Sequence, residues 1–140
     1  MEKKYYGRVN KQLSAIVANE DGLRLKVMAV DTAGDSVSIL CNFYQRDTIT
    51  PGGCFIRDGR PVELMLSLYL PDDEKQLAPL LARCHIAYSR RISREQCMIG
   101  LRYIYFENDG HARLLRFINN ALTSNDTDTG NFVESPSFCV

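Results

Sequence analysis

The stretch from Pro61 to Pro71, P-V-E-L-M-L-S-L-Y-L-P, has a repeat of two residues. Every second position in it is aliphatic: Val62, Leu64, Leu66, Leu68 and Leu70. Successive side chains of a β-strand point to opposite faces of a sheet, so this alternation predicts a strand with one buried face. The sequence Pro71-Asp72-Asp73 is typical of a turn and ends the run.

The same two-residue period recurs along most of the chain, in the ranges 13–17, 23–29, 37–43, 81–89 and 96–106. Each range is long enough for a half-buried strand. Asn19-Glu20-Asp21-Gly22 separates the first two ranges and predicts a hairpin turn. The polar segment 90–95 joins the last two ranges, which we therefore expect to form an antiparallel pair.

The period changes near the end of the chain, where apolar residues fall on one face of a helix: Leu114, Phe117, Ile118, Ala121 and Leu122. Asp109 precedes them as the expected N-cap. About six strands followed by one helix predict a mostly β fold, a small antiparallel barrel or sandwich whose helix covers an open end or side. We divide the chain into an N-terminal basic arm (1–12), this barrel with its helix (13–123) and a flexible polar tail (124–140).

One domain with a sizeable core is expected, because the chain has 140 residues and 45% of them are hydrophobic. Its 17 basic and 17 acidic residues cancel to a formal net charge of +0, which argues against a nucleic-acid polymer as partner. No apolar run is long enough to span a bilayer, and no apolar segment follows the basic start. We therefore expect a cytoplasmic protein with no membrane span.

The cysteines favour reduced thiols, because they are odd in number and form no C-x-x-C pair: Cys41, Cys54, Cys84, Cys97 and Cys139. Cys84 and His85 are adjacent, so in a strand they point to opposite faces and do not share a metal ion. Cys97 is expected to pair near Tyr88, away from Cys84. We predict buried core cysteines and no metal site.

Catalytic patterns are not recognisable in this sequence. It contains no nucleophile elbow, no Walker loop and no zinc-protease motif, and neither His85 nor His111 lies in a catalytic pattern. We expect a protein that is not an enzyme and that carries no cofactor.

The connection from Val30 to Ser36, V-D-T-A-G-D-S, combines two acids, a glycine and two hydroxyls. It is a strand-to-strand turn, a metal loop or one wall of a ligand site, and it lacks the terminal glutamate of a calcium loop. Basic residues cluster ahead of the first strand: Lys3, Lys4, Arg8 and Lys11. Arginine donates to phosphate or to the O6 and N7 edge of guanine, and a carboxylate such as Asp31 accepts from guanine's other edge. The alternative is a solvated basic arm.

In the order of these segments the chain resembles the PilZ domain, the bacterial receptor module for cyclic di-GMP. R-V-N-K-Q (8–12) stands where the family has R-x-x-x-R, and D-T-A-G-D-S (31–36) stands where it has D/N-x-S-x-x-G. P-V-E-L-M-L-S-L-Y-L-P fits the family's long strand, I-G-L-R-Y-I-Y-F (99–106) a later strand, and A-R-L-L-R-F-I (112–118) the helix. The resemblance covers roughly residues 5–122. It implies a six-stranded antiparallel β-barrel of the split-barrel type with a C-terminal α-helix.

The resemblance also implies the positions that would bind the ligand: Arg8, Lys11, Gln12, Asp31, Ala33 and Ser36. Arg8 and Asp31 match the family's binding residues. Gln12 replaces the second arginine, and Ala33 and Ser36 replace the turn's serine and glycine. Losing one charged contact costs about 1.5–3 kcal/mol, which weakens binding roughly ten- to a hundredfold. Ser36 is also expected to oppose a close backbone approach or a positive φ that glycine would allow.

Two functions follow from this resemblance. The first is a cyclic di-GMP-responsive effector or adaptor with a weakened nucleotide site and a protein partner. The second is a PilZ-like scaffold that no longer binds the nucleotide and acts by protein–protein interaction. A third interpretation, an unrelated barrel without a ligand, rests on the long link 43–61, where we expect a short extra strand around Cys54 to Arg57. The arginines of this link are expected to be solvated: Arg46, Arg57 and Arg60.

Overall fold

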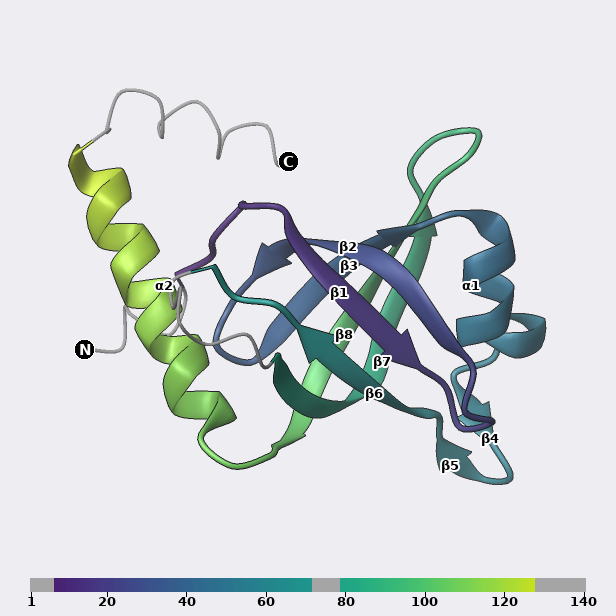
Figure 1. Ribbon diagram of the computed structural model, residues 1–140. Coiled ribbons are helices and arrows are strands. Elements are labelled where there is room, and N and C mark those ends of the chain that lie inside the picture. Colours follow the sequence, from purple (N-terminus) through teal and green to yellow (C-terminus); the bar gives the residue numbers. More distant parts are fainter. Residues whose placement is uncertain (1–6, 72–78, 128–140) are drawn as a thin grey trace.

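The computed structural model describes residues 7–71 and 79–127. Its centre is a closed barrel of six antiparallel strands (Figure 1). These strands are β1 (Leu13–Ala18), β2 (Arg24–Thr32), β3 (Ser36–Cys41), β6 (Glu63–Leu68), β7 (Leu80–Arg91) and β8 (Cys97–Phe106). Around the barrel they follow the order β1-β2-β3-β8-β7-β6, and β6 pairs with β1 to close it. The predicted β-barrel with a C-terminal helix is confirmed.

Aliphatic side chains of the alternating runs fill the barrel. Leu64, Leu66 and Leu68 of β6 are buried, and so are Ile39 of β3 and Ile99 of β8. Burying one such side chain contributes about 1.5–3 kcal/mol. The quoted run therefore supplies one wall of the core, as its period predicted, although the strand itself ends at Leu68.

The hairpin turn between β1 and β2 is held by the side chain of Asn19. Its Oδ1 accepts hydrogen bonds from the backbone N–H groups of Asp21 and Leu23, each at 2.9 Å. Gly22 has a φ of +88°, a conformation that glycine adopts without steric cost. The predicted turn is confirmed. Leu23, in contrast, lies before β2 and is exposed, because the turn extends through it.

The β7–β8 pair is confirmed, but its predicted register is wrong. Cys97 lies opposite Arg91 rather than near Tyr88, and Tyr88 lies opposite Gly100. The turn is short, because Ile92 N donates to Gln96 O at 2.9 Å, and β7 extends to Arg91, into the polar segment that was expected to join the strands. Cys84 lies opposite Tyr103, well separated along the strands from Cys97.

The link 43–61 is folded rather than extended. It forms α1 (Phe43–Ile49), the 3₁₀ turn η2 (Pro51–Gly53) and a small hairpin of β4 (Ile56–Arg57) and β5 (Arg60–Pro61). A capping box starts α1: Asn42 Oδ1 accepts from Gln45 N at 2.8 Å, and Gln45 Oε1 accepts from Asn42 N at 2.9 Å. The expectation that Phe43 continues the strand is therefore wrong, and the expected extra strand is reduced to β4.

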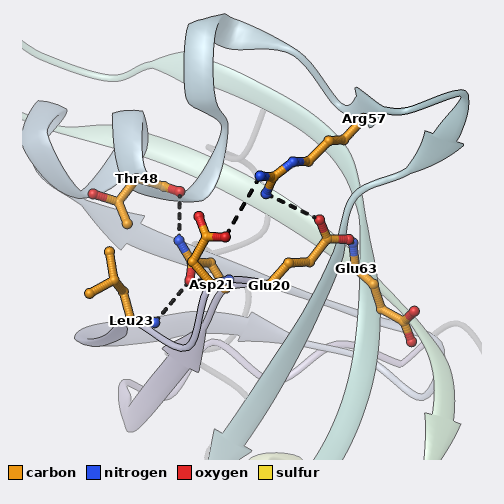
Figure 2. Close-up of polar contacts among 7 residues, drawn as sticks. Glu20, Asp21, Leu23, Thr48, Arg57 and Glu63 are labelled. Atoms are coloured by element: carbon orange, nitrogen blue, oxygen red, sulfur yellow. Dashed lines mark hydrogen bonds and ion pairs between the residues drawn. The ribbon is translucent and has the colours of Figure 1, made fainter.

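Polar contacts fasten this link to the β1–β2 turn, as Figure 2 shows. Arg57 forms ion pairs with Glu20 (3.4 Å) and Asp21 (3.6 Å), and Glu20 Oε2 accepts from the backbone N–H of Glu63 at 3.0 Å. Arg57 is exposed, as expected, and forms these ion pairs at the surface. Arg46 is only partly exposed and pairs with the neighbouring Asp47 at 3.2 Å.

Helix α2 (Gly110–Thr127) covers the end of the barrel opposite α1 (Figure 1). Its predicted apolar face is confirmed, with Leu114, Phe117 and Ile118 buried. Asp109 directly precedes the helix, and its carbonyl accepts from Arg113 N at 3.0 Å. The helix runs four residues beyond Thr123, and the expected tail otherwise lies outside the described residues. Within the described part of the chain, no helix is both long and apolar enough to cross a membrane.

Three of the cysteines are buried as predicted, namely Cys41, Cys84 and Cys97, whereas Cys54 is exposed and Cys139 lies outside the described residues. Burial raises the pKa of Cys84 from 9.0 to about 12. Burial also raises the pKa of Cys41 to about 11, with Cys97 nearby adding to the effect. These two thiols stay protonated in the folded protein at pH values where an unfolded chain ionises them.

We predict that stability falls as the pH rises above 9, partly because of Cys84. The unfolded thiol loses its proton near pH 9, whereas the folded thiol keeps it up to about pH 12, so alkaline pH favours unfolding within that window. At pH 10 this linkage amounts to about 1.4 kcal/mol. Urea unfolding between pH 7 and pH 10 measures it. The variant Cys84→Ala should show a shallower loss over the same range, and an identical slope would contradict the prediction.

Candidate ligand site at the β2–β3 turn

Arg8 lies beside the turn between β2 and β3. A two-hydrogen-bond bridge holds it there, since Val9 N donates to Thr32 O at 2.8 Å and Thr32 N donates to Val9 O at 3.0 Å. Arg8 Nη1 then lies 3.6 Å from Asp31 Oδ2, and Arg8 Nη2 donates to Ser36 Oγ at 3.3 Å. Arg8 and Asp31, the two residues that match the family's binding positions, therefore lie close together.

The direction of Asp31 depends on a β-bulge in β2. Ala29 pairs with Ile39 and Asp31 pairs with Ser38, so Val30 is an additional residue that shifts the register. Ala29 and Thr32 are both fully buried, whereas Asp31 is partly exposed. The bulge therefore places the carboxylate on the outer face, where Arg8 reaches it.

A pocket of about 500 Å³ opens at this turn, and we call it the turn pocket. The segment before β1, the β2–β3 turn with the first residue of β3, and helix α2 line it with Arg8, Ala33, Gly34, Asp35, Ser36, His111 and Leu115. Its volume lies within the range of small-molecule sites in proteins. Helix α2 approaches the turn so closely that a Cβ on Gly34 would lie 3.3 Å from Leu115 Cδ2. The pocket thus combines a cation, two hydroxyl or carboxylate groups and an apolar wall.

The electrostatics of the site favour a polar ligand. Burial raises the pKa of Asp31, and the Arg8 guanidinium opposes that rise. Asp31 Oδ1 and Thr32 Oγ1 are buried and have no hydrogen-bond partner among the described residues. Buried polar groups are normally satisfied, so Asp31 Oδ1 is an acceptor that the protein itself leaves unused, whereas Thr32 is fully buried and is not accessible to a ligand.

The predicted site residues divide between two places. Arg8, Ala33 and Ser36 line the turn pocket, and Asp31 does not line it but contacts Arg8. Ala33 is buried, and its N–H donates to Ser36 O at 2.8 Å. Gln12 instead lines a different hollow on the outer face of β1 and β2. Lys11 is exposed and lines neither. Lys3 and Lys4 lie outside the described residues.

The expected conflict between Ser36 and a positive φ is wrong, whereas the expected obstruction of a close backbone approach stays a prediction. Ser36 begins β3 and does not have a positive φ, so its backbone does not require glycine. Its hydroxyl also contributes to the site, since it accepts from Arg8 and donates to Asp35 Oδ1 at 3.2 Å. Serine, standing where the family has glycine, therefore adds a polar contact and no backbone strain.

Sequence reasoning missed the helix side of the pocket. His111 and Leu115 are one helical turn apart, and His111 stacks on Phe106 with ring centroids 4.8 Å apart. Residues at i and i+4 share a helix face, so the sequence indicated that the two lie together. Which strand turn they approach depends on how α2 docks, and that information is not local in the sequence.

No protein-family model and no curated protein sequence matches the chain. Solved structures do match. The inhibitor of motility MotI/DgrA from Bacillus subtilis is 13% identical, with a TM-score of 0.63 over 85% of this chain and 51% of that one. PlzA from Borreliella burgdorferi, solved in complex with c-di-GMP, is 10% identical, with a TM-score of 0.57 over 88% of this chain and 55% of that one.

A third match is the PilZ domain of CeSA from a cellulose-synthesizing bacterium, at 12% identity, with a TM-score of 0.49 over 81% of this chain and 95% of that one. All three are PilZ-domain proteins. The described chain therefore has the PilZ fold, a conclusion that the two stronger superpositions carry. The chain spans about half the length of the MotI/DgrA and PlzA chains.

Proposed function

We propose that the protein is a cyclic di-GMP-responsive effector or adaptor of the PilZ type, with a weak nucleotide site in the turn pocket. The observation that carries the proposal is the position of Arg8, which lines that pocket while its guanidinium contacts Asp31 and Ser36. The PilZ fold and the c-di-GMP complex of PlzA support the choice of ligand. The proposed role is binding rather than catalysis.

The recognition chemistry would use groups already at the turn. Arg8 can donate to a phosphate oxygen or to guanine O6 and N7, and Asp31 can accept from the ring and amino hydrogens of guanine. The Arg8–Asp31 pair is half-exposed and worth about 0–1 kcal/mol, so a ligand can displace it at small cost. The His111 ring offers an aromatic face at the pocket wall.

The site is expected to be weak because it holds one arginine. Gln12, at the position of the family's second arginine, carries no charge and lines another hollow. One missing charged contact weakens binding by roughly ten- to a hundredfold. We therefore expect a dissociation constant at or above about 1 μM, corresponding to roughly 8 kcal/mol of binding free energy.

Calorimetric titration of the full chain with cyclic di-GMP at moderate salt tests this proposal. The variant Arg8→Ala should weaken binding by a further ten- to hundredfold, because it removes the charged donor that faces the pocket. Arg60→Ala, a matched loss of an exposed arginine on β5, should leave the affinity within about twofold. Nanomolar binding by the unaltered chain would contradict the weakened site, and equal effects of the two variants would contradict its location.

The alternative function is a PilZ-like scaffold that acts on a protein without the nucleotide. The specific observation in its favour is that Arg8 and Gln12, the two positions where the family's R-x-x-x-R segment has arginine, line separate hollows. The calorimetric titration is repeated by fluorescence anisotropy with labelled cyclic di-GMP. If neither measurement detects binding, the scaffold is favoured over the effector.

A further inference from the structure

A second hollow, of about 1020 Å³, lies on the outer face of the barrel, and we call it the outer hollow. Outward-facing side chains of β2 and β3 form its apolar floor, chiefly Met28 and Leu40, which lie opposite each other across the two strands. Tyr69 lies at one end, and Gln96, at the β7–β8 turn, lies at the other. The outer hollow shares no lining residue with the turn pocket.

The floor is apolar although it faces solvent. Met28 and Tyr69 are both more than one-third exposed. Met98 of β8 continues the row, because it pairs with Leu40 on its strand. Methionine side chains are flexible and polarisable, so a row of Met28, Leu40 and Met98 can adapt to apolar side chains of different shapes. Contiguous exposed apolar surface of this kind marks interaction sites.

The charge around the outer hollow is positive. Its lining contains Lys26 and several amide side chains but no aspartate or glutamate. At its end, the β7–β8 hairpin carries Arg90, Arg91 and Arg94, and none of these forms an ion pair with a carboxylate among the described residues. Figure 1 shows this hairpin projecting from the barrel near α1, at the end opposite α2.

Two of these arginines are held in place by aromatic rings. The Arg90 guanidinium lies 5.5 Å from the centroid of Tyr88, and the Arg91 guanidinium lies 5.3 Å from the centroid of Phe43. Arg90 Nη2 also contacts Met98 Sδ at 3.9 Å, which joins the basic hairpin to the apolar row. A stacked guanidinium keeps its planar donors available while losing less side-chain freedom on binding.

We propose that the outer hollow and the β7–β8 hairpin form a docking surface for an acidic, amphipathic segment of a partner protein. Apolar side chains of that segment occupy the floor over Met28 and Leu40, and its carboxylates bind Arg90 and Arg94. Such a segment fits a concave apolar floor beside unpaired arginines better than a flat bilayer does, because a bilayer cannot enter a hollow. It also fits this surface better than a nucleic acid does, because nucleic-acid binding rests on phosphate contacts and not on an apolar floor.

This docking surface goes beyond the proposed nucleotide function and does not depend on it. Met28 pairs with Leu40, and Asp31 pairs with Ser38, which is two residues before Leu40 on β3. The two pairs are therefore consecutive on the outer face of the same sheet. The two sites are neighbours but use different residues. A titration with cyclic di-GMP therefore reports on one, and a peptide titration reports on the other.

Selection from a random library of displayed 16-residue peptides against the immobilised full chain tests the proposal. We expect the enriched peptides to carry net negative charge and large apolar residues at helical spacing. A labelled enriched peptide should bind the double variant R90E/R94E at least about tenfold more weakly than the unaltered chain. The matched control Arg116→Glu, an exposed arginine on α2, should change the affinity less than about twofold.

A second variant keeps the test decisive if the double variant does not fold. Met28→Glu removes the apolar floor and adds a repelling charge, and it should weaken the same peptide by at least about tenfold. Enrichment of basic or uncharged peptides, or equal binding to every variant, would overturn the proposal. The proposal would also be overturned if a 20-nucleotide single-stranded DNA or phosphatidylglycerol vesicles bound more tightly than the enriched peptide and R90E/R94E weakened that binding. Sedimentation showing that the chain dimerises through Met28 would overturn it in favour of a second copy.

Discussion

Replacing Ile49 by alanine is expected to lower the free energy of unfolding by about 2–5 kcal/mol. Ile49 is the last residue of α1, its side chain is 0% exposed, and it belongs to the same apolar cluster as the barrel interior. Removing its outer carbons deletes buried apolar surface and leaves a cavity that the closed barrel cannot easily refill. Urea unfolding monitored by circular dichroism measures the change.

Tyr44→Ala on the same helix is the matched control, because Tyr44 is 85% exposed. Its substitution should change stability by less than about 0.5 kcal/mol. If Ile49→Ala and Tyr44→Ala had the same small effect, α1 would be a surface addition and not a part of the core. A large effect for Ile49 alone establishes that the link 43–61 closes this end of the barrel.

The second large effect is expected at Gly100, where alanine should cost about 1–3 kcal/mol. A Cβ at this position would overlap Cε2 of the Tyr88 ring, so the tyrosine ring must move. The ring lies over Gly100, and its hydroxyl is 2.8 Å from Oγ of Ser38, a residue that is only 5% exposed. Displacing the ring therefore breaks a hydrogen bond and also separates Tyr88 from Arg90.

A double-mutant cycle isolates this contact. In the background Tyr88→Ala, the change Gly100→Ala should become neutral or slightly stabilising, since no ring opposes the new methyl group and glycine loses more backbone entropy on folding. An undiminished loss in that background would show that the glycine is needed for another reason. Thermal unfolding of the four proteins gives the coupling free energy.

The barrel could be predicted because its information is local. A period of two in the apolar residues predicts each strand without information about the strands beside it. The apolar face of α2 is predicted from its own residues in the same way. The start of α1 is also encoded locally, because Asn42 followed by Gln45 is the pattern of a capping box. The alternation predicted a strand through Phe43, although the strand ends at Cys41.

Other features required three-dimensional information. The register of β7 and β8 depends on bulges at Ala87 and Ile104, and neither residue type signals a bulge. At the site, Arg8 and Asp31 could be named from their motif positions. Their contact depends on the bridge between Val9 and Thr32, and the contribution of His111 depends on the docking of α2.

The bulge in β2 decides which face of the sheet carries the acid. In a regular strand of the same length, side-chain alternation from Ala29 would place Val30 opposite Ser38 and turn the Asp31 carboxylate toward the apolar interior. A deletion of Val30 would remove the bulge and still leave Asp31 opposite Ser38, because the deleted residue is the additional one. A barrel with identical motif letters but no bulge would therefore carry its acid on the inner face.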